Sequence, residues 1–147
     1  MSVIIRPARQ GELAAIVAVD ARAYGSAGYG PYVVRQLFDL CPEALVVAIE
    51  SGEIVGYCAC AVASDGVGWI LSLGTAPEAR GRGLGRALTA AAVKALEPLA
   101  PAGLRLTVAP DNAHARRIYD ALGFTVEHLE PDYYGPGKDR LVMVRRG

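Results

Sequence analysis

The sequence predicts an α+β domain in which a mixed, mostly antiparallel central sheet of about seven strands is flanked by about four helices. Apolar, β-branched runs of strand length are interspersed with segments in which apolar residues recur every three or four positions. Turn signals at residues 50–53 and 64–66 join three consecutive strands, which makes those neighbours antiparallel. Strands and helices do not alternate throughout, as they would in a doubly wound parallel sheet. The length of 147 residues fits a single domain, residues 1–147.

The N-terminal half is expected to contribute two helices and four strands. In chain order these are a strand at Val3–Arg6, helices at Gln10–Ala23 and Val33–Leu40, and strands at Ala44–Ile49, Ile54–Ala63 and Val67–Thr75. The first helix follows from the helical spacing of Leu13, Ile16 and Val17. A glycine-rich loop with two tyrosines, "YGSAGYGP", separates the two helices.

The C-terminal half is expected to contribute two helices and three strands. In chain order these are a helix at Leu84–Leu96, a strand at Leu104–Ala109, a helix that Asp111-Asn112 caps and Gly123 ends, and strands at Phe124–Leu129 and Arg140–Val144. The spacing predicts that Ile118, Ala121 and Leu122 form the inward face of the second of these helices. The last two strands flank the loop "EPDYYGPGKD".

Composition restricts the functional classes. Lysine plus arginine and aspartate plus glutamate number 15 each, and this zero net charge argues against a general nucleic-acid-binding protein. The sequence has no apolar stretch near the roughly 20 residues that span a bilayer. Cys41, Cys58 and Cys60 lack the CxxC spacing of a metal site, and His114 and His128 stand alone. We therefore expect buried thiols, no metal, no membrane association and a cytoplasmic location.

The stretch "EARGRGLGRAL", residues 78–88, concentrates glycine and arginine where a helix begins. The first turn of a helix presents backbone N–H groups without internal partners, together with the positive end of the helix dipole. Glycines allow another molecule to approach that backbone, and arginines add positive charge, so the stretch indicates a site for a pyrophosphate or similar anion. Neither the P-loop pattern nor the dinucleotide fingerprint fits the glycine spacing. The alternative is a plain glycine-rich turn with solvated arginines.

Two motifs about 30 residues apart resemble those of one family, the GNAT superfamily of acetyl-CoA-dependent N-acetyltransferases. Residues 80–85 fit R-x-x-G-x-G, and "NAHARRIYDALGF", residues 112–124, is similar to N-x-x-A-x-x-x-Y-x-x-x-G-F. The opening "VIIRPARQGEL" also resembles that of the family. The resemblance implies the same fold and acetyl-CoA as the co-substrate. It also implies a set of cofactor-binding residues: Leu73, Gly74 and Thr75 for the pantetheine and acetyl group, Arg80, Gly81, Arg82, Gly83, Leu84, Gly85 and Arg86 for the pyrophosphate, and Asn112 for the pantetheine.

The resemblance assigns the catalytic role to Tyr119, as general acid toward the departing thiolate. Asn112 and Tyr119 lie seven residues apart, or two helical turns, so both project from one stripe of the helix. The family's glutamate is missing from both places where its branches carry a base, which are Thr107 and the stretch Val67–Ile70 here. An α-amine with a pKa near 8 is roughly a tenth deprotonated at pH 7, whereas a lysine needs about 4–5 kcal/mol to lose its proton. The missing base therefore favours an α-amine acceptor, and the alternative is a base that acts through water.

The acceptor side is inferred from loop tyrosines. The ending "DYYGPGKDRLVM" resembles the bacterial enzymes that acetylate the N-terminal alanine of a ribosomal protein. In the N-terminal acetyltransferases, tyrosines in two regions flank a peptide slot, and the residues in those regions here include Tyr24, Tyr29, Tyr133 and Tyr134. The alternatives are tyrosines that merely pack locally, a small-molecule amine acceptor, and a non-catalytic acyl-CoA sensor. The expected partners are acetyl-CoA and a peptide N-terminus or small amine, without nucleic acid, in a monomer or homodimer.

Overall fold

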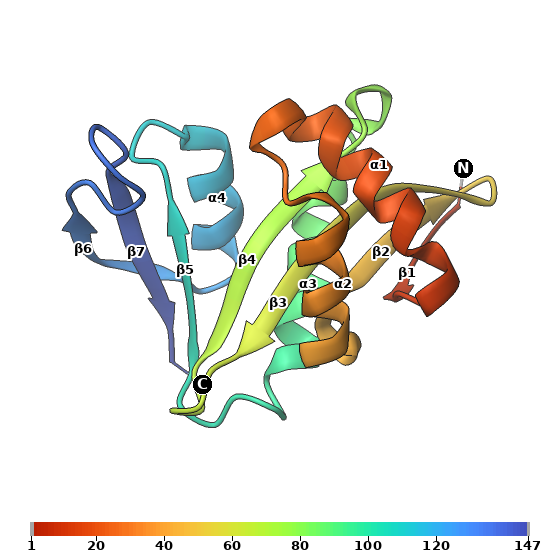
Figure 1. Ribbon diagram of the computed structural model, residues 1–147. Helices are drawn as coiled ribbons and strands as arrows, with labels where there is room; N and C mark the ends of the chain where they lie inside the picture. Colours follow the sequence, from red (N-terminus) through yellow and green to blue (C-terminus); the bar gives the residue numbers. More distant parts are fainter. Residues whose placement is uncertain (1, 147) are drawn as a thin grey trace.

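The computed structural model describes residues 2–146 and has the α+β architecture that the sequence predicts (Figure 1). Within these residues seven strands form one sheet in the order β1-β2-β3-β4-β5-β7-β6, and only β4 and β5 pair in parallel. The strands are β1 (Val3–Pro7), β2 (Val46–Glu50), β3 (Glu53–Val62), β4 (Gly68–Thr75), β5 (Leu104–Val108), β6 (Thr125–Glu130) and β7 (Arg140–Arg145). The helices are α1 (Leu13–Tyr24), α2 (Gly30–Leu40), α3 (Leu84–Leu96) and α4 (Ala113–Ala121).

Short 3-10 turns account for most differences between the expected and observed boundaries. Gln10–Glu12 is such a turn, so α1 begins only at Leu13. Pro42–Ala44 is another, and it delays the start of β2. Conversely, α2 begins before Val33 because Pro31 occupies its first turn, where the missing N–H costs nothing.

The inward face predicted for α4 is wrong in one residue. Ala121 is exposed, and Tyr119 is instead the buried residue of this helix. Ile118 and Leu122 are partly buried against the core, as predicted. Ala121 is the last residue of this short helix.

Helices cover both faces of the sheet, which therefore separates two hydrophobic cores. Leu88 of α3 belongs to one core, and Ile16 of α1 belongs to the other. Neighbouring residues of one strand alternate between them: Val46 faces the α3 side and Val47 the α1 side, as the two-residue period of a strand requires. All three cysteines are free and buried, as predicted. Within residues 2–146 no helix is long and apolar enough to cross a membrane.

The pairing between β4 and β5 is short, and this shapes the site. It covers three residue pairs, ending at Ile70 and Leu106, after which the two strands diverge (Figure 1). On its other edge β4 carries a bulge, because Ala59 and Cys60 of β3 face Ser72 and Ile70 and leave Leu71 without a partner. The free edge of β4 and the end of β5 therefore face each other across an opening in the sheet.

Candidate functional site

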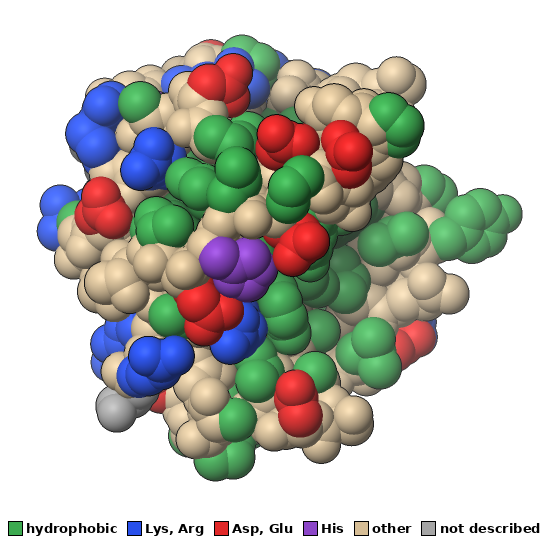
Figure 2. Space-filling model, turned by 90° about the vertical axis from the view of Figure 1, so that its left-hand side faces the viewer, with side chains coloured by type: hydrophobic (Ala, Val, Ile, Leu, Met, Phe, Trp, Pro, Cys, Tyr) green, Lys and Arg blue, Asp and Glu red, His purple; other side chains and the backbone are tan. Residues whose placement is uncertain are grey.

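A cleft of about 1170 Å³ occupies this opening and extends over the start of α3 and the side of α4. It exceeds the volume of about 300–1,000 Å³ that is common for small-molecule sites. Figure 2, which views the molecule from its β6–β7 side, shows a hollow bordered largely by hydrophobic side chains. The sequence-predicted residues that line the cleft are Tyr24, Tyr29, Leu73, Gly74, Thr75, Arg80, Gly81, Gly83, Leu84, Gly85, Arg86, Asn112, Tyr119 and Tyr134. Arg82 and Tyr133 lie outside this lining.

The glycine–arginine turn forms a cradle at the start of α3. Gly81 and Gly83 have φ angles of +79° and +77°, a left-handed conformation that favours glycine. Gly83 is the N-cap residue, and because it has no side chain it leaves the amides of the first turn unbonded. A Cβ added at either glycine would meet nothing within 4 Å, so the backbone there is open to a ligand. These features fit a pyrophosphate group.

The arginines of the turn divide into two groups. Arg80 and Arg86 line the cleft. Arg82 instead forms an ion pair with Glu50 of β2 at 2.6 Å, and this partner lowers the pKa of the Glu50 carboxyl. The predicted contact of Arg82 with a pyrophosphate would therefore require the ion pair to open. Sequence reasoning had no means of finding Glu50, which lies 32 residues away in the chain.

Tyr119 is directed into the cleft from α4. Its side chain is buried and packs edge-on against Phe124, with ring centroids 6.1 Å apart. The hydroxyl has no hydrogen-bond partner among residues 2–146. Every fully buried side-chain polar atom of these residues does have a partner, so the Tyr119 oxygen is not fully buried and is open to the cleft. Burial is the main cause that raises the pKa of Tyr119 well above its usual range. The phenol is therefore protonated at neutral pH and has an O–H available to a ligand.

Asn112 caps the helix that carries Tyr119. Its Oδ1 accepts a hydrogen bond from the backbone N–H of Ala115 at 3.1 Å, which occupies the oxygen and leaves the side-chain NH₂ group for a ligand. Both residues line the cleft, as their spacing predicts. The cap therefore orients α4 and offers one polar group to the cleft.

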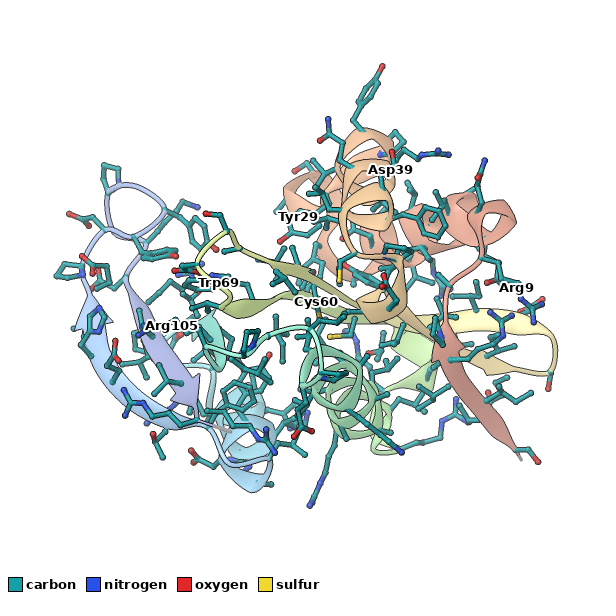
Figure 3. All side chains as sticks on the ribbon, turned by 90° about the horizontal axis from the view of Figure 1, so that it is seen from below. Arg9, Tyr29, Asp39, Cys60, Trp69 and Arg105 are labelled. Carbon is teal, nitrogen blue, oxygen red and sulfur yellow. The ribbon has the colours of Figure 1, made fainter. Side chains whose placement is uncertain are left out.

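Two of the predicted acceptor tyrosines bind the backbone of β4. The Tyr29 hydroxyl donates to the carbonyl oxygen of Leu71, the bulged residue, at 3.1 Å, and the Tyr24 hydroxyl donates to the carbonyl oxygen of Leu73. Figure 3 shows Tyr29 reaching from the helical layer toward the sheet. Burial raises the pKa of Tyr29 to about 12. Tyr133 packs edge-on against Tyr134 with ring centroids 4.8 Å apart, so it supports a residue of the lining.

A buried polar network that sequence reasoning missed lies below these tyrosines. Asp20 of α1 is 2% exposed, and its Oδ1 accepts a hydrogen bond from the Tyr57 hydroxyl at 2.6 Å. Its Oδ2 accepts from the backbone N–H groups of Tyr29 at 2.6 Å and Gly30 at 3.3 Å, at the start of α2. The Tyr57 hydroxyl also contacts Ser72 Oγ at 2.9 Å. The available signal was an acidic residue on the apolar stripe of the first helix.

The lining contains no free carboxylate. Asp20 is the one acidic residue among the described lining residues, and Tyr57 and two amides occupy its oxygens. Thr107 of β5 lines the cleft at a place where the family resemblance expects a glutamate. The cleft therefore combines an anion cradle, a phenol donor and an aromatic wall without a carboxylate base.

Comparison with known proteins identifies the class of this chain. Residues 13–124 match the acetyltransferase (GNAT) family, and the chain belongs to this family. An uncharacterized N-acetyltransferase of Methanocaldococcus jannaschii is 29% identical over 144 residues, which cover 97% of this chain and 91% of the relative. The protein is accordingly an N-acetyltransferase that uses acetyl-CoA as co-substrate.

Two further proteins are similar to this chain. A mycothiol acetyltransferase of Streptomyces bingchenggensis is 36% identical over 140 residues, which cover 89% of this chain and 46% of the relative. The chain thus spans less than half the length of that enzyme. The crystal structure of the ribosomal-protein-S18-alanine N-acetyltransferase from Escherichia coli has a TM-score of 0.80 at 21% identity, covering 98% of this chain and 93% of that one. It shares the fold.

Proposed function

We propose that this single-domain enzyme transfers an acetyl group to the α-amino group of a peptide or protein N-terminus. The observation that carries the proposal is the lack of a free carboxylate among the described residues of the cleft. Without a free carboxylate to take the proton, an acceptor that loses its proton easily is favoured, and an α-amine with a pKa near 8 does so far more readily than a lysine. The fold of the ribosomal-protein-alanine enzyme supports the same acceptor class.

The cradle at α3 would hold the pyrophosphate. Backbone amides of the first helical turn and the side chains of Arg80 and Arg86 supply hydrogen bonds and positive charge there. Asn112 offers its NH₂ group to the pantetheine arm. When bound, acetyl-CoA supplies the acyl group as a thioester.

Two groups near the middle of the cleft would serve the transfer itself. The Tyr24 contact shows that the carbonyl of Leu73 points toward the cleft, and in a strand the N–H of a residue points to the same side as its carbonyl. The Leu73 amide would therefore stabilise negative charge that develops on the acyl oxygen. The protonated phenol of Tyr119 would donate to the sulfur as the thiolate leaves.

The similarity to mycothiol acetyltransferases favours a second candidate, a small-molecule amine acceptor. Both candidates use the same cradle and the same donor, so they differ only in what occupies the tyrosine-lined end of the cleft. The acceptor therefore has to be identified by substrate comparison.

The decisive experiment is an acceptor panel read by thiol release from acetyl-CoA. The panel contains peptides with free N-termini, the same peptides with blocked N-termini and an internal lysine, and common small amines. We expect turnover with free N-termini and none with blocked peptides. Turnover confined to small amines would establish the second candidate. Coenzyme A binding without any turnover would indicate an acyl-CoA sensor.

A further inference from the structure

The charges that line the cleft lie at two places. Arg80 and Arg86 belong to the cradle at the start of α3, whereas Lys138 and Arg140 come from the β6–β7 loop and the first residue of β7. Asp20 is the single carboxylate among the described lining residues, and its hydrogen bonds to Tyr57 and two amides leave it unavailable to a ligand. The cleft thus carries a second pair of cations that the cradle does not explain.

Neither Lys138 nor Arg140 forms an ion pair with another residue of the described part of the chain. The acidic side chains of the same loop bind its own backbone instead. Asp132 Oδ1 accepts from the N–H of Gly137 at 2.8 Å, and Asp139 Oδ1 accepts from the N–H of Asp132 at 2.9 Å. The loop carboxylates therefore order the loop and leave its two cations without an anionic partner.

Arg140 is held in one orientation. Its guanidinium lies 5.1 Å from the centre of the Tyr134 ring, and Nη1 donates to the backbone oxygen of Asp139 at 2.7 Å. A guanidinium has five N–H donors, so most of them stay available for an acceptor group. A half-buried, oriented arginine and an exposed lysine two residues before it, both lining the cleft, are a suitable pair for a carboxylate.

This pair lies at the acceptor end of the cleft. The Arg140 guanidinium lies over the ring of Tyr134. Tyr134 is close enough to Tyr29 to raise the pKa of the Tyr29 hydroxyl, in addition to the larger effect of burial. Tyr29 in turn binds the bulge of β4 at Leu71, two residues from Leu73, whose amide is assigned to the acyl oxygen. The cations therefore lie beside the tyrosines assigned to the acceptor.

We propose that Lys138 and Arg140 form a carboxylate-binding subsite that selects acceptors with a carboxylate close to the reactive amine. The proposal rests on the proposed function, because it concerns the acceptor of the same transfer. The carboxylate has two sources: the side chain of an acidic residue that follows the N-terminal residue, or the α-carboxylate of a free amino acid. Polyamines and basic peptides, in contrast, would be repelled by the same two charges.

The test compares matched acceptors on the full-length enzyme. One arm uses peptides that differ only in a second residue of Asp, Asn or Lys, and the other uses a free amino acid and its amide. We expect a kcat/KM up to about fivefold higher for the Asp peptide than for the Asn peptide at low salt, since an exposed ion pair contributes up to about 1 kcal/mol. The Lys peptide is expected to be the poorest acceptor. A preference for the free amino acid over its amide, with peptides indifferent, assigns the same subsite to the second source.

Variants connect the preference to the two residues. Lys138→Glu and Arg140→Gln should remove the preference, and Lys138→Glu should favour the Lys peptide. Lys94→Glu is the matched control, because Lys94 is an exposed residue of α3 outside the cleft lining, and it should leave the preference intact. Equal rates for each pair of acceptors, or a preference that persists in both cleft variants, would overturn the proposal.

Turnover and binding together separate this inference from the proposed function. If peptides are acetylated without regard to the second residue, and the free amino acid reacts no better than its amide, the proposed function stands and the subsite is wrong. If no acceptor is turned over, the proposed function is wrong, and calorimetric titration of the same peptides into the enzyme with coenzyme A decides the subsite. The subsite is supported if the Asp peptide binds more tightly than the Asn peptide and Lys138→Glu removes this difference. Equal affinities of the two peptides would refute the subsite.

Discussion

Asp20→Ala should destabilise the fold and disturb the acceptor end of the cleft together. Asp20 accepts three hydrogen bonds, from the Tyr57 hydroxyl and from the amides of Tyr29 and Gly30. The substitution leaves these donors without their partner, although Tyr57 retains its contact with Ser72. Because two of the donors belong to the start of α2, their loss also releases the backbone that positions the Tyr29 side chain.

The size of the effect follows from the three bonds. A hydrogen bond to a charged group contributes about 1.5–3 kcal/mol, and a buried donor left unsatisfied costs about 1–3 kcal/mol. Allowing for non-additivity among neighbours, Asp20→Ala should lower the free energy of unfolding by about 3–5 kcal/mol. Asp20→Asn keeps the volume and one acceptor oxygen, so its loss should be about 1–2 kcal/mol. A loss of 4 kcal/mol corresponds to a fall in Tm of roughly 8–16 °C for a chain of this size.

Urea unfolding with and without coenzyme A gives the measurement, and initial rates give the functional counterpart. For Asp20→Asn we expect KM for the acceptor to rise while the Kd of coenzyme A stays the same. Asp39→Ala is the control: Asp39 forms an exposed ion pair with Arg35 on the surface of α2, and its loss should cost less than about 0.5 kcal/mol. If Asp20→Ala is no more destabilising than Asp39→Ala, the hydrogen bonds of Asp20 do not stabilise the start of α2.

Three further predictions concern the donor, the cradle and acid stability. Tyr119→Phe should lower kcat by about 10²- to 10⁴-fold and leave the Kd of coenzyme A unchanged by calorimetry; an unchanged kcat would exclude Tyr119 as the acid. Gly83→Val places a β-branched residue at a φ of +77°, so it should weaken coenzyme A binding at least about tenfold and lower the free energy of unfolding by about 1–3 kcal/mol; unaltered affinity would refute the cradle. Hydrogen bonds from Arg6 lower the pKa of Glu12 to about 2, below the value of about 4.3 in the unfolded chain. The pair therefore stabilises the folded protein at a pH above about 4.3, and this stabilisation is lost as the pH falls toward 2. Glu12→Gln should therefore narrow the difference between urea midpoints at pH 7 and at about pH 2.5, and an unchanged difference would show that this pair does not contribute.

The sequence by itself determined the features that depend on neighbouring residues. The periods of two and of three to four define the seven strands and four helices, because backbone geometry fixes which side chains share a face. The glycine–arginine turn indicates an anion cradle, because unpartnered amides at a helix start are a property of a few consecutive residues. The spacing of Asn112 and Tyr119 places both on the cleft side of one helix for the same reason.

The tertiary structure alone decided the features that join distant parts of the chain. Divergence of β4 from β5 opens the cleft, and strand order rather than local propensity sets which strands are neighbours. Tyr57 donates a hydrogen bond to Asp20, which lies 37 residues away in the sequence, and Arg82 of the glycine–arginine turn pairs with Glu50, which lies 32 residues away. The placement of Tyr134 of the β6–β7 loop near Tyr29 likewise depends on the packing of the sheet against its helices. Such contacts have no local pattern in the sequence, because they depend on where the other segment lies once the two cores have formed.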